Sequence, residues 1–377
     1  MKVRSNEVSA DIERVMLQFI GAVDRKIQQE ERTTNERSII LNVHDYAQRI
    51  TLAIIFLLLC RRENVIDFDA AEDSLVGLIE RAGPDFLNPM VPFSVGLPVL
   101  RPFITWLSRF RPVGRMDRCI NDYINSAVDP HQATERTYGK VLGANQVLAS
   151  ESKSKHGSER RLTEGLINAL SDGKITEEEY KSNAYILVMA GSETTATTIA
   201  WILWQLAQNP TIQTKLREVI SNEGMDADYV VWCIMEGIRY HPPAPLFADR
   251  VITEDITTND GLLIPKGTSF MPSIYSIHHD ESIWPEHDKF IPERWQNQSE
   301  SHPAAFVGFG LGARNCPGGR MAIHEIKLVL KNILTRYRVD KCEGTPDKYR
   351  FVSPGLLFTI PEVPVKLRFT PLPEVTQ

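Results

Sequence analysis

Apolar residues at helical spacing dominate the start of the chain. Within Ser9–Gln28 they recur every three or four positions, at Ile12, Val15, Met16, Phe19, Ile20 and Val23. This spacing puts them on one face and predicts a helix. Val43–Arg61 predicts a second, mostly buried helix. Its apolar run, Ile50–Cys60, is shorter than the ~20 residues that a membrane span requires.

The strongest helix signal lies over Thr176–Gln208. Thr176 followed by Glu179 is a capping-box pattern, which fixes the start of the helix. Asn209-Pro210 is a natural stop. Further helices are predicted over Thr211–Ile220, Tyr229–Tyr240 and Met321–Tyr337.

Between the helices, shorter apolar runs separated by turn residues predict strands. These runs are Asp249–Thr257, Leu262–Pro265 and Thr268–Pro272. Gly355–Phe369 alternates and turns, which predicts a C-terminal hairpin. Pro84–Pro112 predicts loops and short helical pieces, and Asp129–Arg161 an exposed polar segment. We therefore expect a mainly α fold with minor β structure, in a single domain over residues 1–377.

Composition excludes several classes of protein. The net charge of −6 argues against nucleic acid as a partner. The five cysteines are far apart and include no CxxC pair. This argues against a structural zinc site, an iron–sulfur site or a disulfide framework, and favours reduced thiols.

One cysteine lies in a distinctive string, since Phe309–Gly318 has the sequence FGLGARNCPG. A cysteine that ligates iron must be a thiolate, which needs hydrogen-bond donors or positive potential. Cys316 lies just before a predicted helix, whose first N–H groups supply both. Gly310 and Gly318 allow a tight turn and the approach of a flat ligand. The alternative is an ordinary buried cysteine in a glycine-rich loop.

The string matches F-x-x-G-x-R-x-C-x-G in full, so the chain resembles the cytochromes P-450, a family of haem-thiolate monooxygenases. The resemblance implies haem b as the cofactor and Cys316 as the ligand of its iron. It also implies that Phe309 shields the sulfur and that Arg314 pairs with a haem propionate. A thiolate ligand favours O–O cleavage.

A second motif joins two distant segments. Glu236 and Arg239 are separated by one helical turn, and Arg294 follows in the string PERW. Taken alone, the first pair is an exposed ion pair of little energy. The family's E-x-x-R pattern implies that all three side chains form a buried structural network, in which an unpaired charge costs several kcal/mol.

A third motif, AGSETT, lies in the middle of the predicted helix Thr176–Gln208. Its glycine and threonines predict a local widening of the helix. The family's A-G-x-E-T-T implies that Ala190 adjoins the haem and that Thr194, with Glu193, delivers protons to bound dioxygen. The alternative is a packing notch of small residues.

Other positions follow from the resemblance alone. Arg250 corresponds to an arginine that contacts a propionate, with a surface strand residue as the alternative. The walls of a mostly apolar substrate pocket are assigned by family position to Ala190, Ala244, Leu246, Leu356 and Leu357.

The resemblance implies a cytochrome P-450 fold that lacks its N-terminal part. We expect the membrane anchor, the first strands and the helix with a Trp-x-x-x-Arg haem clamp to be absent. Trp106–Arg109 is one residue too short to replace that clamp. We expect a fragment or an incomplete gene prediction. Residues 85–89 are most similar to the animal microsomal branch.

The predicted activity is insertion of one oxygen atom from O2 into a lipophilic small molecule. The resemblance implies electrons from an NADPH-cytochrome reductase, with cytochrome b5 as a further partner. It also implies a location on the cytosolic face of the endoplasmic reticulum membrane. Two alternatives remain: a non-catalytic haem-binding fragment, and a haem-thiolate isomerase or dehydratase of peroxides.

Overall fold

A computed structural model describes residues 5–60, 66–69, 164–246, 250–300, 304–352 and 358–373. Several predictions lie outside these residues. They concern the segments 84–112 and 129–161, the Trp106–Arg109 string, and the pocket positions Leu356 and Leu357.

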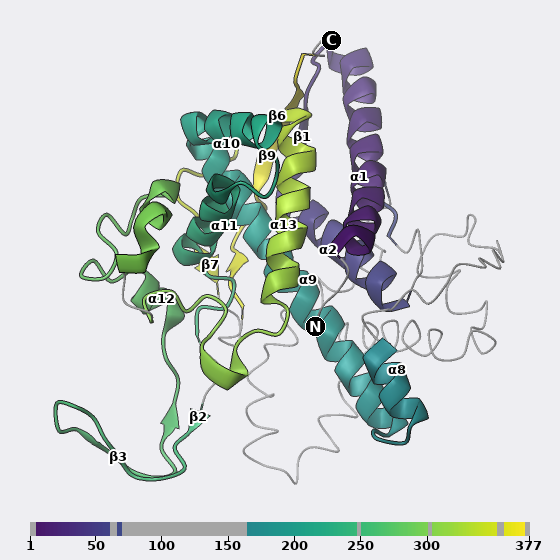
Figure 1. The fold of residues 1–377 in the computed structure, drawn as a ribbon. Helices are drawn as coiled ribbons and strands as arrows, with labels where there is room; N and C mark the ends of the chain where they lie inside the picture. The colour runs from purple at the N-terminus through teal and green to yellow at the C-terminus, as the bar shows by residue number, and fades with distance from the viewer. Residues whose placement is uncertain are drawn as a thin grey trace.

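Helices make up most of the described chain (Figure 1). They are α1 (Ser5–Thr34), α2 (Val43–Cys60), α8 (Glu164–Ser171), α9 (Glu177–Gln208), α10 (Pro210–Asn222), α11 (Asp228–Tyr240), α12 (Ile274–His278) and α13 (Gly319–Leu334), with 3-10 turns η2 (Pro292–Glu300) and η3 (Gly312–Arg314). The helices predicted from apolar spacing are confirmed. One boundary is wrong, because Tyr337 belongs to a strand rather than to the end of a helix.

The strands form small antiparallel sheets. The largest has the order β1-β9-β6, from Ile39–Asn42, Lys366–Pro371 and Tyr337–Lys341. Three pairs complete the set: β2 (Arg250–Val251) with β5 (Ser269–Phe270), β3 (Ile256–Thr257) with β4 (Leu263–Ile264), and β7 (Phe351–Val352) with β8 (Ile360–Pro361). The mainly α fold with minor β structure is confirmed.

The predicted C-terminal hairpin is wrong. β8 pairs with β7, whereas β9 lies between β1 and β6. Leu367 and Phe369 of β9 are buried, and they lie opposite the buried Leu41 and Val339. Burial of these apolar side chains on a shared face selects distant partners over the local turn.

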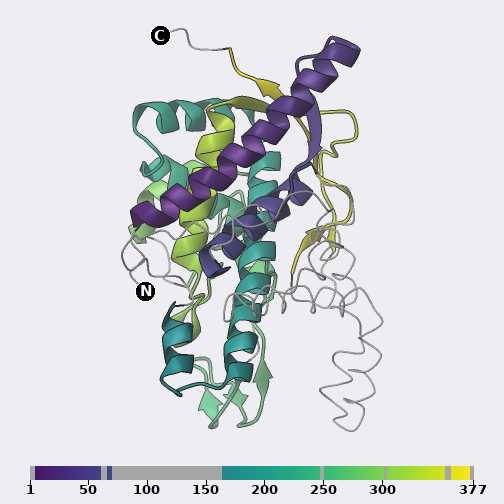
Figure 2. The same ribbon diagram turned by 90° about the vertical axis from the view of Figure 1, so that its right-hand side faces the viewer.

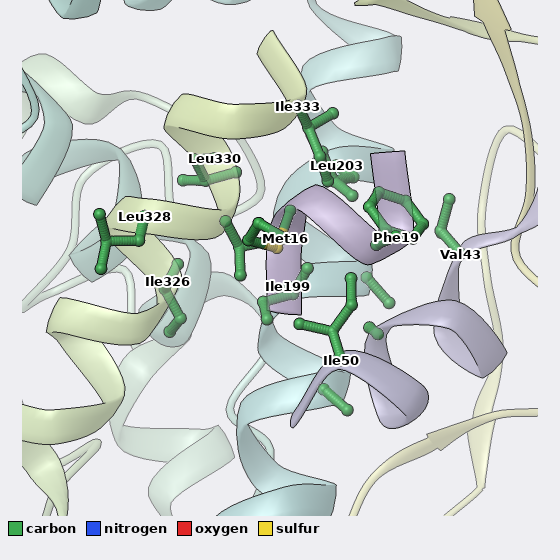
Figure 3. Close-up of a cluster of buried hydrophobic side chains, with 14 of the residues drawn as sticks. Met16, Phe19, Val43, Ile50, Ile199, Leu203, Ile326, Leu328, Leu330 and Ile333 are labelled. Atoms are coloured by element: carbon green, nitrogen blue, oxygen red, sulfur yellow. The ribbon is translucent and has the colours of Figure 1, made fainter. Parts of the chain in front are cut away.

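The core surrounds α9, which crosses the molecule and packs most extensively against α2 (Figures 1 and 2). α1 and α13 add further apolar side chains, and Figure 3 shows Met16, Ile50, Ile199 and Ile333 meeting there. Each such side chain contributes about 1.5–3 kcal/mol through burial. By length and composition α9 could span a membrane, but 61% of its apolar window is buried, as in a core helix.

Local chemistry explains how α9 begins and continues. The Thr176 hydroxyl accepts from the N–H of Glu179 at 3.2 Å, and the Glu179 carboxylate accepts from the N–H of Thr176 at 2.8 Å. This capping box is confirmed.

The predicted widening at the centre of α9 is wrong, because α9 is an unbroken α-helix. A Cβ atom at Gly191 would lie 3.2 Å from Ile55 of α2, so the glycine is a packing notch.

Candidate functional site

The Cys316 loop, residues Phe309–Gly318 before α13, folds around its own backbone. The N–H of Cys316 donates to the carbonyl of Phe309 at 2.7 Å, and that of Gly310 to the carbonyl of Val307 at 2.9 Å. Gly310 and Gly312 have φ of 73° and 71°, which side chains with a Cβ rarely adopt. The loop therefore needs glycine at these positions.

The Cys316 side chain is exposed at the end of this loop. It lies just before α13, and the N-cap Gly318 supplies no side-chain hydrogen bond to the first turn. Cys316 thus lies two residues before the N-cap of α13, whose first N–H groups have no acceptor within the helix. In the described part of the chain the sulfur is free of any disulfide. This arrangement suits an external metal ligand better than a buried cysteine.

Close packing holds the loop against the protein. A Cβ atom at Gly308 would lie 2.5 Å from Cγ2 of Ile238 in α11. A Cβ atom at Gly319 would lie 3.1 Å from the Phe309 ring. The ring is half-buried between α13 and Phe306. The neighbouring elements therefore fix the position of the thiol.

Behind the loop the structure brings Glu236, Arg239 and Arg294 together. The guanidinium of Arg239 donates to both carboxylate oxygens of Glu236 at 2.9 Å. Arg294 donates to Oε1 of Glu236 at 3.0 Å. Glu236 and Arg239 are fully buried. The indole N–H of Trp295 also donates to Glu236, at 2.9 Å, a contact that the PERW string contained but sequence reasoning did not assign.

A residue that sequence reasoning missed connects this cluster to the loop. Arg239 donates to the carbonyl of His278 at 2.8 Å. The Nε2 atom of His278 accepts from the N–H of Val307 at 3.0 Å, and its ring stacks on Phe306. Burial, with the positive charge of Arg239, lowers the pKa of His278 to about 3. The imidazole is therefore neutral and can accept this hydrogen bond.

The central turns of α9 carry the other predicted residues. Ala190 is exposed and Thr194 is half-buried. The Thr194 hydroxyl donates to the carbonyl of Ala190 at 2.8 Å. Glu193 points elsewhere, because its carboxylate accepts from Nε2 of Gln48 in α2 at 2.6 Å. Thr194 and Glu193 therefore have different partners in the structure.

Arg314 is exposed at the end of η3. The other predicted residues described lie between α11 and β5. Arg250 is half-buried in β2, opposite Phe270. Ala244 is half-buried, and Leu246 forms a β-bridge with Ser273. Sequence reasoning missed Thr359, whose N–H and hydroxyl donate to the carbonyls of Pro243 and Pro242 at 2.8 and 2.9 Å. These two bonds fix the turn before Ala244, and the roles of Arg250, Ala244 and Leu246 stay predictions.

Comparison with known proteins identifies the family, because the profile described as Cytochrome P450 matches residues 1–369. The chain belongs to the cytochrome P450 family. It is 32% identical over 242 residues to rat Cytochrome P450 4F5, which is 60% of this chain and 46% of that protein. It is 30% identical over 307 residues to mouse Cytochrome P450 3A41, which is 76% of this chain and 56% of that protein.

A third relative is Leukotriene-B4 omega-hydroxylase 3 of mouse. It is 34% identical over 218 residues, which is 52% of this chain and 40% of that protein. The chain thus spans about half the length of the curated relatives that it matches.

Members of the cytochrome P450 family bind haem b, and the residues present fit that group. Cys316 offers an exposed sulfur at a helix N-terminus. Gly310 and Gly312 add no side chain to the turn that precedes it. A thiolate is a suitable axial ligand for haem iron. The loop therefore has both the donor and the open face that a flat macrocycle needs.

Proposed function

We propose that the protein is a haem-thiolate monooxygenase. It inserts one oxygen atom from O2 into a lipophilic small molecule and draws its electrons from a reductase. The observation that carries this proposal is the exposed thiol of Cys316, held in a glycine-rich turn at the start of α13. Membership of the cytochrome P450 family supports it.

On the thiolate side, Cys316 would hold the iron, while Arg314 and Arg250 would pair with the propionates. The Phe309 ring packs against Gly319 at the start of α13 and would limit the access of water to the sulfur. A Cβ atom at Gly318 would touch the Cys316 sulfur at 3.9 Å, so glycine there would leave the sulfur less covered. When bound, a thiolate-ligated haem supplies the electron density that favours O–O cleavage.

On the opposite side, α9 would supply protons. Ala190 is small and exposed, so the ring could approach the helix there. Thr194 would hold a proton at Oγ1, and Glu193 would renew it. Ala190, Ala244, Leu246, Leu356 and Leu357 would line the apolar substrate pocket. Glu236, Arg239 and Arg294 would keep the Cys316 loop rigid.

The partners follow from the same assignment. An NADPH-cytochrome reductase, with cytochrome b5 as an optional second donor, would deliver electrons. The protein would work on the cytosolic face of the endoplasmic reticulum membrane. One relative is named as a leukotriene hydroxylase, which supports a lipophilic substrate here.

Replacing the thiol tests the proposal. The haem-reconstituted chain is reduced and exposed to carbon monoxide, and its absorbance is recorded. We expect the thiolate-type Soret band in the wild type and in Cys342→Ser, and its loss in Cys316→Ser. NADPH consumption with reductase and O2 then separates a monooxygenase from an isomerase. A thiolate-type band that survives Cys316→Ser, or a well-folded wild type that never shows it, would overturn the proposal.

A further inference from the structure

The Glu193 carboxylate lies in a polar cluster between α2 and α9. Its Oε2 atom accepts from Nε2 of Gln48 at 2.6 Å. Its Oε1 atom lies 3.4 Å from Nε2 of His44 and accepts from the Thr197 hydroxyl at 3.4 Å. The side chains of His44 and Glu193 are 12% and 14% exposed. The cluster is thus largely enclosed but keeps a solvent edge.

The cluster favours the charged form of the acid. Burial raises the pKa of Glu193. The hydrogen bond and charge of His44 and the hydrogen bond of Gln48 lower the pKa by more than burial raises it, so the net shift is downward. The nearest other charges on α2, Arg49 and Asp45, are paired with each other at 3.3 Å. Within the part of the chain that the structure describes, the titratable side chain in contact with the carboxylate is His44.

In this position Glu193 is turned away from Thr194. Consecutive residues project about 100° apart around a helix. The Thr194 hydroxyl is bonded to the carbonyl of Ala190, while Glu193 is bonded to α2. To renew a proton at Thr194, the carboxyl group must first leave Gln48. A protonated carboxyl group leaves more easily, because hydrogen bonds to a charged acceptor are stronger.

We propose that His44 returns the proton to Glu193 and that Gln48 positions the carboxylate to receive it. The inference rests on the proposed function, in which Glu193 serves Thr194. The N–H bond at Nε2 of protonated His44 breaks and an O–H bond forms at Oε1 of Glu193. His44 becomes neutral and keeps its hydrogen at Nδ1. The vacant Nε2 then takes a proton from a hydronium ion of the solvent, which is left as water. The neutral carboxyl group then releases Gln48 and turns towards Thr194.

The separation of 3.4 Å between Nε2 and Oε1 is compatible with this transfer, because such contacts are often long before substrate binds. Nε2 of His44 also lies 3.2 Å from the Thr197 hydroxyl, which orients the ring. Among the residues that the structure describes, the buried Oε1 of Gln48 has no hydrogen-bond partner. An unsatisfied buried oxygen is unfavourable, so the Nε2 contact to Glu193 is what determines the Gln48 rotamer.

The first test is independent of turnover. Infrared spectra of the haem-loaded chain are recorded against pH, and the Glu193 carboxyl signal is identified by subtracting Glu193→Gln. We expect His44→Gln and Gln48→Leu each to raise the pKa of Glu193 by about 1 unit. The matched control is His324→Gln, which removes a part-buried histidine bonded to Ser9. An unchanged Glu193 titration in both test variants would overturn the inference.

The second test measures turnover with reductase. We expect His44→Gln to lower kcat at least about tenfold with KM unchanged, and to raise the solvent isotope effect. Added to Glu193→Gln, the same change has no further effect, because both act on one proton. Normal kcat in His44→Gln, with Glu193→Gln impaired, refutes the inference and leaves the proposed function standing. Absence of the thiolate-type band in the wild type refutes the proposed function instead.

Discussion

The two sides of the candidate haem site are held in different ways. On the thiolate side, α11, α12, η2 and the Cys316 loop are joined by buried hydrogen bonds that involve Glu236, Arg239 and His278. On the α9 side, Thr194 is bonded to its own helix and Glu193 to side chains of α2. In the proposed function the first side would fix a ligand in place, whereas the second would depend on side chains that change partners. Positioning and proton movement are thus assigned to separate parts of the molecule.

The largest effect is expected where the thiolate side depends on a single carboxylate. Glu236→Gln leaves Arg239 and Arg294 buried without their counter-charge, so we expect a loss of about 3–5 kcal/mol in unfolding free energy. Urea denaturation measures it. Glu286→Gln removes an exposed partner of Lys289 and is the matched control, with an unchanged midpoint. Equal midpoints for the two variants would show that the buried cluster does not stabilise the fold.

Low pH is expected to lower the unfolding free energy through His278 on the thiolate side. His278 is neutral in the fold, with a pKa lowered to about 3 by burial, against 6.5 in the unfolded chain. Its contribution to stability is complete above pH 6.5 and is lost as pH falls towards 3. Between these two pKa values the unfolding free energy falls by about 1.4 kcal/mol for each pH unit of acidification.

The variant His278→Gln keeps an acceptor for the N–H of Val307 but does not titrate. We expect the slope of its unfolding free energy between pH 6 and pH 5 to differ from that of the wild type by about 1.4 kcal/mol per pH unit. Comparing slopes removes the opposing contribution of Glu325, whose pKa burial raises. Parallel slopes would contradict the assignment of a neutral His278.

A smaller effect is expected from crowding beneath the Cys316 loop. In Gly308→Ala the new methyl group would lie 2.5 Å from Ile238, so we expect a loss of about 1–3 kcal/mol. Thermal unfolding and haem affinity both report it. Gly165→Ala in α8 is the control, since nothing lies within 4 Å of its Cβ position. A haem affinity that stays normal in Gly308→Ala would show that the loop tolerates displacement.

The smallest effect is expected at the start of α9. Thr176→Ala removes one half of the capping box, and we expect a cost of about 1 kcal/mol. Denaturant unfolding measures this loss of unfolding free energy. Thr176→Ser keeps the hydroxyl, so we expect it to unfold at the wild-type midpoint. Because this cap is far along α9 from Thr194, we expect the infrared signal of Glu193 to stay unchanged. A shift of that signal would mean that the α9 side is as rigidly coupled as the thiolate side.

Sequence was most informative where chemistry is local. The Phe309–Gly318 string fixes a turn through its own glycines, and the capping box needs only Thr176 and Glu179. Both could be predicted because the interacting groups are neighbours in the chain.

Contacts between distant segments could not be predicted in the same way. Gln48 meets Glu193 only because α2 packs on α9, and Val307 meets His278 only because α12 lies beside the loop. Neither residue belongs to a motif. The place of Lys366–Pro371 in the sheet was also missed, because alternation of apolar residues identifies a strand but not its neighbours.

The position of β9 has a consequence for biosynthesis. β1 is synthesised long before its neighbour in the sheet, the strand at Lys366–Pro371. Until Lys366–Pro371 emerges, the edges of β1 and β6 that face β9 lack this partner, and closure of so long a loop is slow. A nascent chain halted before Lys366 would therefore expose two open strand edges, which makes late-stalled products prone to aggregation.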